Sequence, residues 1–166
     1  FYQNSIQQQN IGNNLHNKII IDKLPLNLIR IKFIHNLFPN TAFIMSVRHP
    51  LDCILSCFTQ NFLLNSAMIN FLDLERTAIL YDKVMQIWQN SEKLINLNVH
   101  IIKYEDLISN FDNETKKMIT FLGLDWEENI KNYKKLLIKK ERIRTPSYSQ
   151  VIKPIYSSSI NKWKNY

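Results

Sequence analysis

The sequence predicts one α/β domain in which helices flank a parallel β-sheet, and two observations lead to this prediction. Three short apolar runs, at 18–22, 41–47 and 99–104, have the composition of strands that are buried on both faces. Segments with apolar residues at helical spacing separate these runs, and strands that alternate with helices are typical of parallel sheets. At 166 residues and 45% hydrophobic content, the chain is large enough for one core.

The first half of the chain contains two of the predicted strands. Residues 1–17 are polar and patternless, which indicates a lead-in before a domain at 18–166. The run KIIID at 18–22 predicts the first strand, and 24–40 predicts a helix that Pro39 and Asn40 end. The run TAFIMSV at 41–47 predicts the second strand. A helix is expected to begin at Pro50, because a missing N–H costs nothing in the first turn.

The second half predicts mainly helices. A long helix is expected at about 69–97, followed by the third strand at 99–104 and a helix at 113–124. Gly123 is expected to end that helix with a left-handed cap. A basic helix at 130–140, a loop and a final helix at 157–166 complete the prediction.

Charge and composition limit the possible partners. The chain has 21 basic and 14 acidic residues, and a net charge of +7 attracts nucleic acid, anionic lipid or a polyanionic cofactor. Cys53 and Cys57 lie four residues apart, where a disulfide is rare, so both are expected to be reduced. The four histidines lack metal-site spacing, and no metal is expected. No targeting or membrane segment is visible, which favours the cytoplasm.

The segment FIMSVRHPLDCILSCF, residues 43–58, predicts an anion site. Ligands of parallel sheets lie beyond the carboxyl ends of the strands, where Arg48 leaves the second strand. The helix that follows points free N–H groups into the same space, and Ser56 shares its polar face with Asp52. The alternative is that Arg48 pairs with Asp52 and Ser56 is simply exposed. Two isolated glycines exclude a Walker loop or a dinucleotide fingerprint within this chain.

Five segments together resemble the sulfotransferases that use 3′-phosphoadenosine 5′-phosphosulfate (PAPS). They are IIDKLPLN, LFPNTAFIMSVRHPLDCILSCF, IIKYEDL, FLGLDWEE and SYSQVIKPIYSSSINKW, in the order expected. The last is similar to protein-tyrosine sulfotransferases and to tetratricopeptide-linked bacterial sulfotransferases. The resemblance covers about residues 18–166, and it implies a P-loop NTPase-like parallel sheet flanked by helices, without the first strand and phosphosulfate loop.

The resemblance also implies roles for individual residues. Arg48 and Ser56 would hold the 3′-phosphate of PAPS, and Tyr104 would contact the nucleotide. Lys23 would stabilise the sulfuryl group in transfer, assisted by Ser147, because fixed positive charge lowers the barrier of such a reaction. The residues expected to close over the cofactor are Ser147, Gln150, Val151, Ile152, Lys153, Pro154, Ile155, Tyr156 and Lys162.

The sequence also departs from this family. The glycine-containing loop and a base for the acceptor are absent, and the chain begins with Phe1 rather than Met. We therefore expect the carboxy-terminal part of a longer enzyme, inactive by itself. Gln60 stands where tyrosine sulfotransferases have arginine, which leaves the hydroxyl acceptor open among peptides, glycans and small molecules. His49 replaces an acidic residue and is expected to cap the helix.

A second functional class stays open. The basic segment 131–144 is the main argument for a nucleic-acid binder, although its interleaved apolar residues favour a solvated amphipathic helix. The alternative to an enzyme is therefore a non-catalytic basic module that binds adenosine 3′,5′-bisphosphate or nucleic acid. The tryptophans, including Trp163, are expected to pack in the core or between helices.

Overall fold

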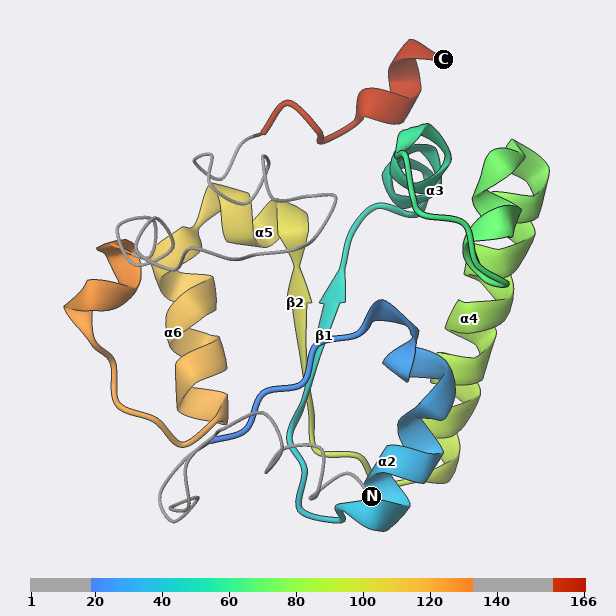
Figure 1. Ribbon diagram of the computed structural model, residues 1–166. Coiled ribbons are helices and arrows are strands. Elements are labelled where there is room, and N and C mark those ends of the chain that lie inside the picture. The colour runs from blue at the N-terminus through green and yellow to red at the C-terminus, as the bar shows by residue number, and fades with distance from the viewer. Residues whose placement is uncertain (1–18, 133–156) are drawn as a thin grey trace.

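A computed structural model of the chain describes residues 19–132 and 157–166. Within these ranges, strands β1 (Phe43–Val47) and β2 (Val99–Lys103) form a parallel two-stranded sheet with helices on both sides (Figure 1). Phe43 pairs with Val99 at one end of the sheet and Val47 with Lys103 at the other. The two strands therefore end at the same level, and the residues that follow them are neighbours.

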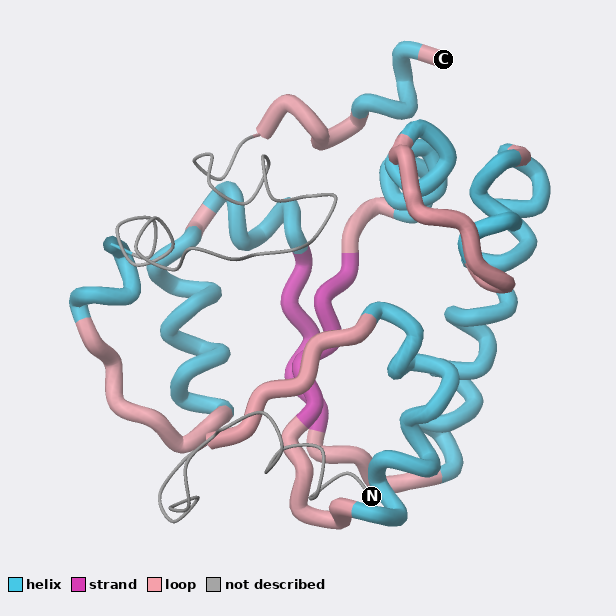
Figure 2. Tube along the Cα trace, viewed as in Figure 1, coloured by secondary structure: helices cyan, strands magenta, loops and turns pink. Residues whose placement is uncertain are grey.

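One face of the sheet carries the main core. The 3₁₀ helix η1 (Pro25–Arg30), helix α2 (Ile31–Leu37) and helix α4 (Leu74–Leu94) lie on this side (Figure 2). Ile31, Met45 and Trp88 form the buried cluster, and burial of such a side chain contributes about 1.5–3 kcal/mol. The partly buried residues around them are Leu28, Phe43, Val47, Met85, Leu97 and Val99.

The other face of β2 packs against α6. Helix α5 (Tyr104–Ser109) follows β2 directly, and α6 (Phe111–Phe121) runs back along the strand (Figure 1). The ring of His100 stacks on Phe121 with 5.3 Å between the ring centroids. Gly123 ends this helix with a φ of +67°, so the predicted left-handed cap is confirmed.

Helix α3 (Pro50–Thr59) begins beyond the carboxyl end of β1 and packs against α4. Its start at Pro50 is the predicted one. The 3₁₀ helix η2 (Met68–Leu72) precedes α4, and Asp73 separates them because its carboxylate accepts a hydrogen bond from the main-chain N–H of Arg76 at 2.7 Å. The single helix expected at 69–97 is therefore two elements. The short helices η3 (Glu128–Asn132) and η4 (Lys162–Asn165) complete the described part of the chain.

The prediction of a strand at 18–22 is wrong for the residues that are described. Residues 19–22 form no strand, and Ile19, Ile20 and Ile21 are 59%, 53% and 83% exposed. β-Branched composition favours a strand only where a neighbouring strand supplies hydrogen bonds and a packing surface. β1 pairs with β2 alone among the described elements, so this run has no such neighbour.

Two further helix predictions need correction, and one helix was missed. The helix expected at 24–40 is the 3₁₀ helix η1 followed by α2, and α5 was not predicted. The final helix expected at 157–166 is a series of turns that ends in η4, because Asn161 has a left-handed φ of 57° that an α-helix does not allow. The basic helix at 130–140 lies outside the described residues from 133 on.

The described residues contain no helix long and apolar enough to cross a membrane. They also contain no group of three or more His, Cys, Asp or Glu side chains placed to hold a metal ion.

Candidate anion-binding site

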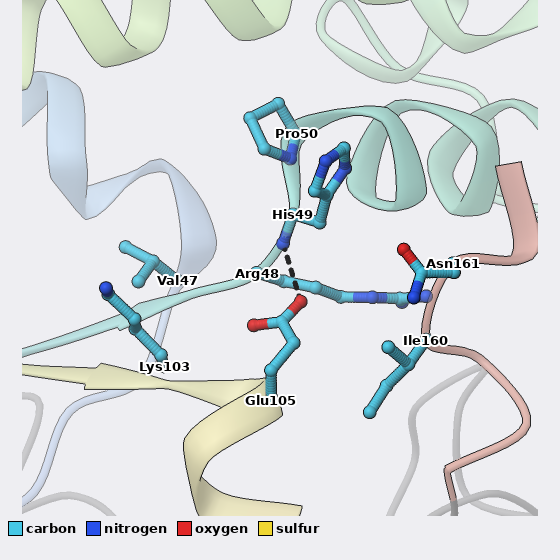
Figure 3. A pocket seen from close by; sticks show the side chains of 8 residues that line it. All are labelled: Val47, Arg48, His49, Pro50, Lys103, Glu105, Ile160 and Asn161. Atoms are coloured by element: carbon cyan, nitrogen blue, oxygen red, sulfur yellow. Dashed lines mark hydrogen bonds between the residues drawn. The ribbon is translucent and has the colours of Figure 1, made fainter. Parts of the chain in front are cut away.

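Three segments converge at the carboxyl end of the sheet. They are the turn from β1 into α3, the turn from β2 into α5, and the C-terminal segment, which we define as residues 157–166. Between them lies a cavity of about 390 Å³ (Figure 3). Its lining residues are Val47, Arg48, His49, Pro50, Lys103, Glu105, Ile160 and Asn161.

The start of α3 supplies main-chain donors. The first donor, the N–H of His49, bonds Oε1 of Glu105 at 2.8 Å, and Pro50 has no N–H. The N–H groups of Leu51 and Asp52 cannot bond within the helix, and no described residue accepts a hydrogen bond from them. These N–H groups and the helix dipole favour an anion at this end of the helix.

Arg48 is held by three neighbours. Its Nη2 donates a hydrogen bond to the main-chain carbonyl of Ser159 and lies 4.0 Å from Oδ1 of Asp52. The guanidinium carbon lies 5.5 Å from the centroid of the Tyr104 ring. The Arg48 side chain is 22% exposed, and its Nε is buried without a partner among the described residues. The guanidinium is thus fixed in orientation, with donors that these contacts do not use.

Asp52 is the most buried acidic group of the site, at 1% exposure. Its two carboxylate oxygens accept hydrogen bonds from the C-terminal segment: Oδ2 from the N–H of Asn161 at 2.7 Å and Oδ1 from the N–H of Trp163 at 3.0 Å. The His49 ring stacks on the Trp163 ring, with centroids 5.3 Å apart and planes within 8°. The Tyr104 hydroxyl lies 3.2 Å from Oγ of Ser159.

The structure brings two of the predicted site residues together, namely Arg48 and Tyr104. Ser56 is exposed one helical turn beyond Asp52, and Nη2 of Arg48 lies 4.0 Å from Oδ1 of Asp52. The expected contact of Ser56 with a phosphate stays a prediction. Lys162 is exposed in the C-terminal segment.

Lys23 is exposed in the coil before η1 and does not line the cavity. Ser147 and residues 150–156 lie outside the described residues, so their expected roles stay predictions.

The prediction that His49 caps α3 is wrong for its side chain. His49 occupies the capping position, but its side chain makes no capping hydrogen bond and stacks on Trp163 instead. Trp163 lies in η4 and packs against the start of α3, in agreement with the expected packing between helices. The sequence analysis missed Glu105. An acidic residue just after one strand can accept a hydrogen bond from the start of the helix that follows the neighbouring strand, so its position was a usable signal.

The two cysteines are free and half-buried on α3, as predicted. A hydrogen bond from the Cys57 thiol lowers the pKa of Cys53 to about 7; burial opposes this shift, and the Arg48 guanidinium adds to it. The same hydrogen bond, together with burial, raises the pKa of Cys57 above its usual value.

Fold and site together define the class of protein: an α/β domain with a candidate anion site beyond the carboxyl ends of parallel strands. The sulfotransferase family model matches residues 2–128, and the chain therefore belongs to the sulfotransferase family. The resemblance found in the sequence motifs is thereby confirmed.

Several known proteins are similar to this chain. An uncharacterized protein of Aquifex aeolicus is 30% identical over 148 residues, which cover 89% of this chain and 19% of that protein. Protein-tyrosine sulfotransferase 2 of Gallus gallus is 21% identical over 156 residues, covering 88% and 40%. Protein-tyrosine sulfotransferase of Drosophila melanogaster is 22% identical over 156 residues, covering 87% and 30%. The chain thus spans less than half the length of each of these relatives.

Proposed function

We propose that this chain forms the 3′-phosphate half of a sulfotransferase site that moves the sulfuryl group from PAPS to a hydroxyl acceptor. The observation that carries the proposal is the oriented Arg48 guanidinium at the edge of a cavity whose lining also includes the residues that begin α3. A guanidinium fork and helix N–H groups are complementary to a phosphate. Membership of the sulfotransferase family supports this donor.

Four residues in or next to the cavity have a role in this proposal. Arg48 binds the phosphate with the N–H donors that Ser159 does not use, and the Tyr104 ring keeps the guanidinium plane in place. Lys103 adds positive charge to the lining. The Glu105 carboxylate repels phosphate and so restricts an anion to the part of the cavity next to Arg48.

The transfer itself breaks the bond between sulfur and the donor's phosphate oxygen and forms a bond between sulfur and the acceptor oxygen. The acceptor hydroxyl loses its proton to a base. Fixed cations stabilise the negative charge on the oxygens in the transition state, and Lys23, Lys162 and Ser147 are the residues we propose for contact with the donor. Ser56 would add a hydroxyl donor to the phosphate.

The acceptor is a hydroxyl on a peptide, a glycan or a small molecule. The names of the Gallus gallus and Drosophila melanogaster relatives favour protein tyrosine among these. Gln60 stands where the resemblance to tyrosine sulfotransferases places an arginine, and this replacement argues for a differently shaped acceptor pocket.

Calorimetry with adenosine 3′,5′-bisphosphate tests the proposed phosphate site. Arg48→Ala is expected to weaken binding by about 10- to 100-fold, because a hydrogen bond between charged groups contributes about 1.5–3 kcal/mol. Arg30→Ala, which removes the same charge from an exposed position in η1, is expected to leave binding unchanged. Adenosine 5′-monophosphate, which lacks the 3′-phosphate, should bind equally to the parent chain and to Arg48→Ala.

Equal affinity of the parent chain and Arg48→Ala for the bisphosphate would refute the site. A second outcome would support a non-catalytic binding module instead. In it, a chain extended to the full length of the relatives binds the bisphosphate but transfers no labelled sulfuryl groups from PAPS.

A further inference from the structure

The C-terminal segment is held to the start of α3 by a buried carboxylate. Asp52 is 1% exposed, and each of its oxygens accepts one main-chain N–H, from Asn161 and Trp163. Asn161 is left-handed, with a φ of 57°, and Lys162 begins η4. Successive residues of left- and right-handed conformation turn alternate N–H groups toward one point and form a concave anion-binding nest. Here the bound anion is the Asp52 side chain.

The remaining contacts of this segment reach the residues of the candidate site. The carbonyl of Ser159 accepts a hydrogen bond from Arg48, and its hydroxyl lies 3.2 Å from the Tyr104 hydroxyl. The Trp163 ring stacks on His49. Ile160 and Asn161 form part of the cavity wall. Docking of the segment therefore completes the cavity and fixes the orientation of Arg48.

We propose that Asp52 is a positioning residue of the sulfotransferase site, which it completes by docking the C-terminal segment through the N–H groups of Asn161 and Trp163. This inference rests on the proposed function for its effect on donor binding, but the docking itself does not. Lys162 lies between the two bonded N–H groups, so its backbone is held while its side chain stays exposed. Removing Asp52 releases the segment, and with it the Ser159 carbonyl that orients Arg48.

The sign of one effect separates positioning from direct electrostatics. Asp52 lies 4.0 Å from Nη2 of Arg48, and a carboxylate there reduces the attraction of Arg48 for a phosphate. If charge were its whole contribution, Asp52→Asn would bind adenosine 3′,5′-bisphosphate more tightly. A positioning role predicts weaker binding, because the oriented guanidinium and the cavity wall are lost with the docked segment.

Hydrogen exchange measured by NMR tests the docking. In the parent chain the amides of Asn161 and Trp163 are expected to be protected. In Asp52→Asn and Asp52→Ala their exchange should accelerate at least about 10-fold, while the amides of β1 and β2 stay protected. Asn161→Gly is the matched variant, since it keeps both N–H groups and the left-handed conformation, and it is expected to retain protection.

Calorimetry with adenosine 3′,5′-bisphosphate tests the positioning role. Asp52→Asn is expected to weaken binding about five-fold or more, as for a coupling of ordinary size between two sites. Asp82→Asn is the control, because it removes the same charge from an exposed position on α4 and should not change the affinity. If the Asp52 variants unfold, Trp163→Pro removes one donated N–H while leaving Asp52 in place. It should accelerate exchange at the Asn161 amide and weaken bisphosphate binding.

Unchanged exchange at Asn161 and Trp163 in Asp52→Asn would overturn the docking. Accelerated exchange with unchanged or tighter bisphosphate binding would overturn the positioning role. Absence of bisphosphate binding in the parent chain would refute the proposed function and the positioning role together, whereas the exchange experiment would still decide the docking by itself.

Discussion

Replacing Glu105 tests how the ends of the two strands are joined. Glu105 follows β2, and its Oε1 accepts the N–H of His49, which follows β1, at 2.8 Å. Pro50 has no N–H, so this hydrogen bond satisfies the first main-chain donor at the start of α3. Glu105→Ala leaves that donor without its partner. Glu105→Gln keeps an acceptor oxygen of similar reach and removes the charge.

The expected loss of stability is modest but measurable. A hydrogen bond to a charged group contributes about 1.5–3 kcal/mol, and the lower end applies here because Glu105 is half-buried and water can replace part of the bond. We expect Glu105→Ala to reduce the free energy of unfolding by about 1.5 kcal/mol and Glu105→Gln by roughly 0.5–1 kcal/mol. Domains are commonly stable by only about 5–15 kcal/mol, so either change is a visible fraction.

The affinity for an anion should move the other way in Glu105→Gln. Glu105 and Arg48 line the same cavity, and we take a separation of roughly 9 Å between the carboxylate and a phosphate bound by Arg48. Two unit charges at that separation interact by about 0.5 kcal/mol in water and by about 1.8 kcal/mol at an effective dielectric constant of 20. Removing the carboxylate should therefore tighten binding of adenosine 3′,5′-bisphosphate by roughly 2- to 20-fold for each phosphate charge affected.

Urea unfolding followed by circular dichroism gives the stability, and calorimetry gives the affinity. Glu92→Gln serves as the control, because it removes the same charge from an exposed position on α4 and should alter neither quantity. Destabilisation by Glu105→Ala no larger than that of the control would refute the link between the strand ends. Weaker anion binding by Glu105→Gln would refute the assigned repulsion.

Two predictions concern other parts of the chain. The rate of Cys53 alkylation by iodoacetamide should rise with pH around a midpoint near the Cys53 pKa of about 7. Cys57→Ala removes the hydrogen bond that lowers this pKa, so the midpoint should move toward the ordinary value of 9.0. An unmoved midpoint would contradict this cause. Gly123→Ala should lower the free energy of unfolding by about 1–2 kcal/mol, because alanine is strained at a φ of +67°. A steric clash does not contribute, since a Cβ at this position meets no atom within 4 Å. Gly123→Asn should lose less, and equal urea midpoints for the two variants would argue against backbone strain.

Local rules were sufficient for several elements of the fold. The strands at 41–47 and 99–104 are composed of residues that favour a buried strand, and they pair as β1 and β2. Pro50 begins α3 and Gly123 ends α6, because each residue restricts or permits backbone conformation by its own covalent structure. The run at 18–22 shows the limit of these rules. It has the same composition, but a strand also needs a partner that composition does not supply.

Part of the candidate site was also predictable. Arg48 and Tyr104 each follow a strand, and parallel pairing necessarily brings such residues to one edge. The role of Asp52 was not predictable, because its partners lie 109 and 111 residues away and donate main-chain N–H groups, which any residue type other than proline carries. The stacking of His49 on Trp163 was also missed, because the two rings are far apart in the sequence.

Residue identity alone thus placed a cation and a helix start at the end of a strand, because side-chain charge and the missing N–H of proline are local properties. The order of the motifs along the chain placed it in its family. Only the tertiary structure decided what surrounds Arg48. Asp52 could oppose a bound anion or dock the C-terminal segment. The outcome depends on which distant N–H groups reach its two oxygens, and the distances between those groups and the oxygens are set by the folded chain.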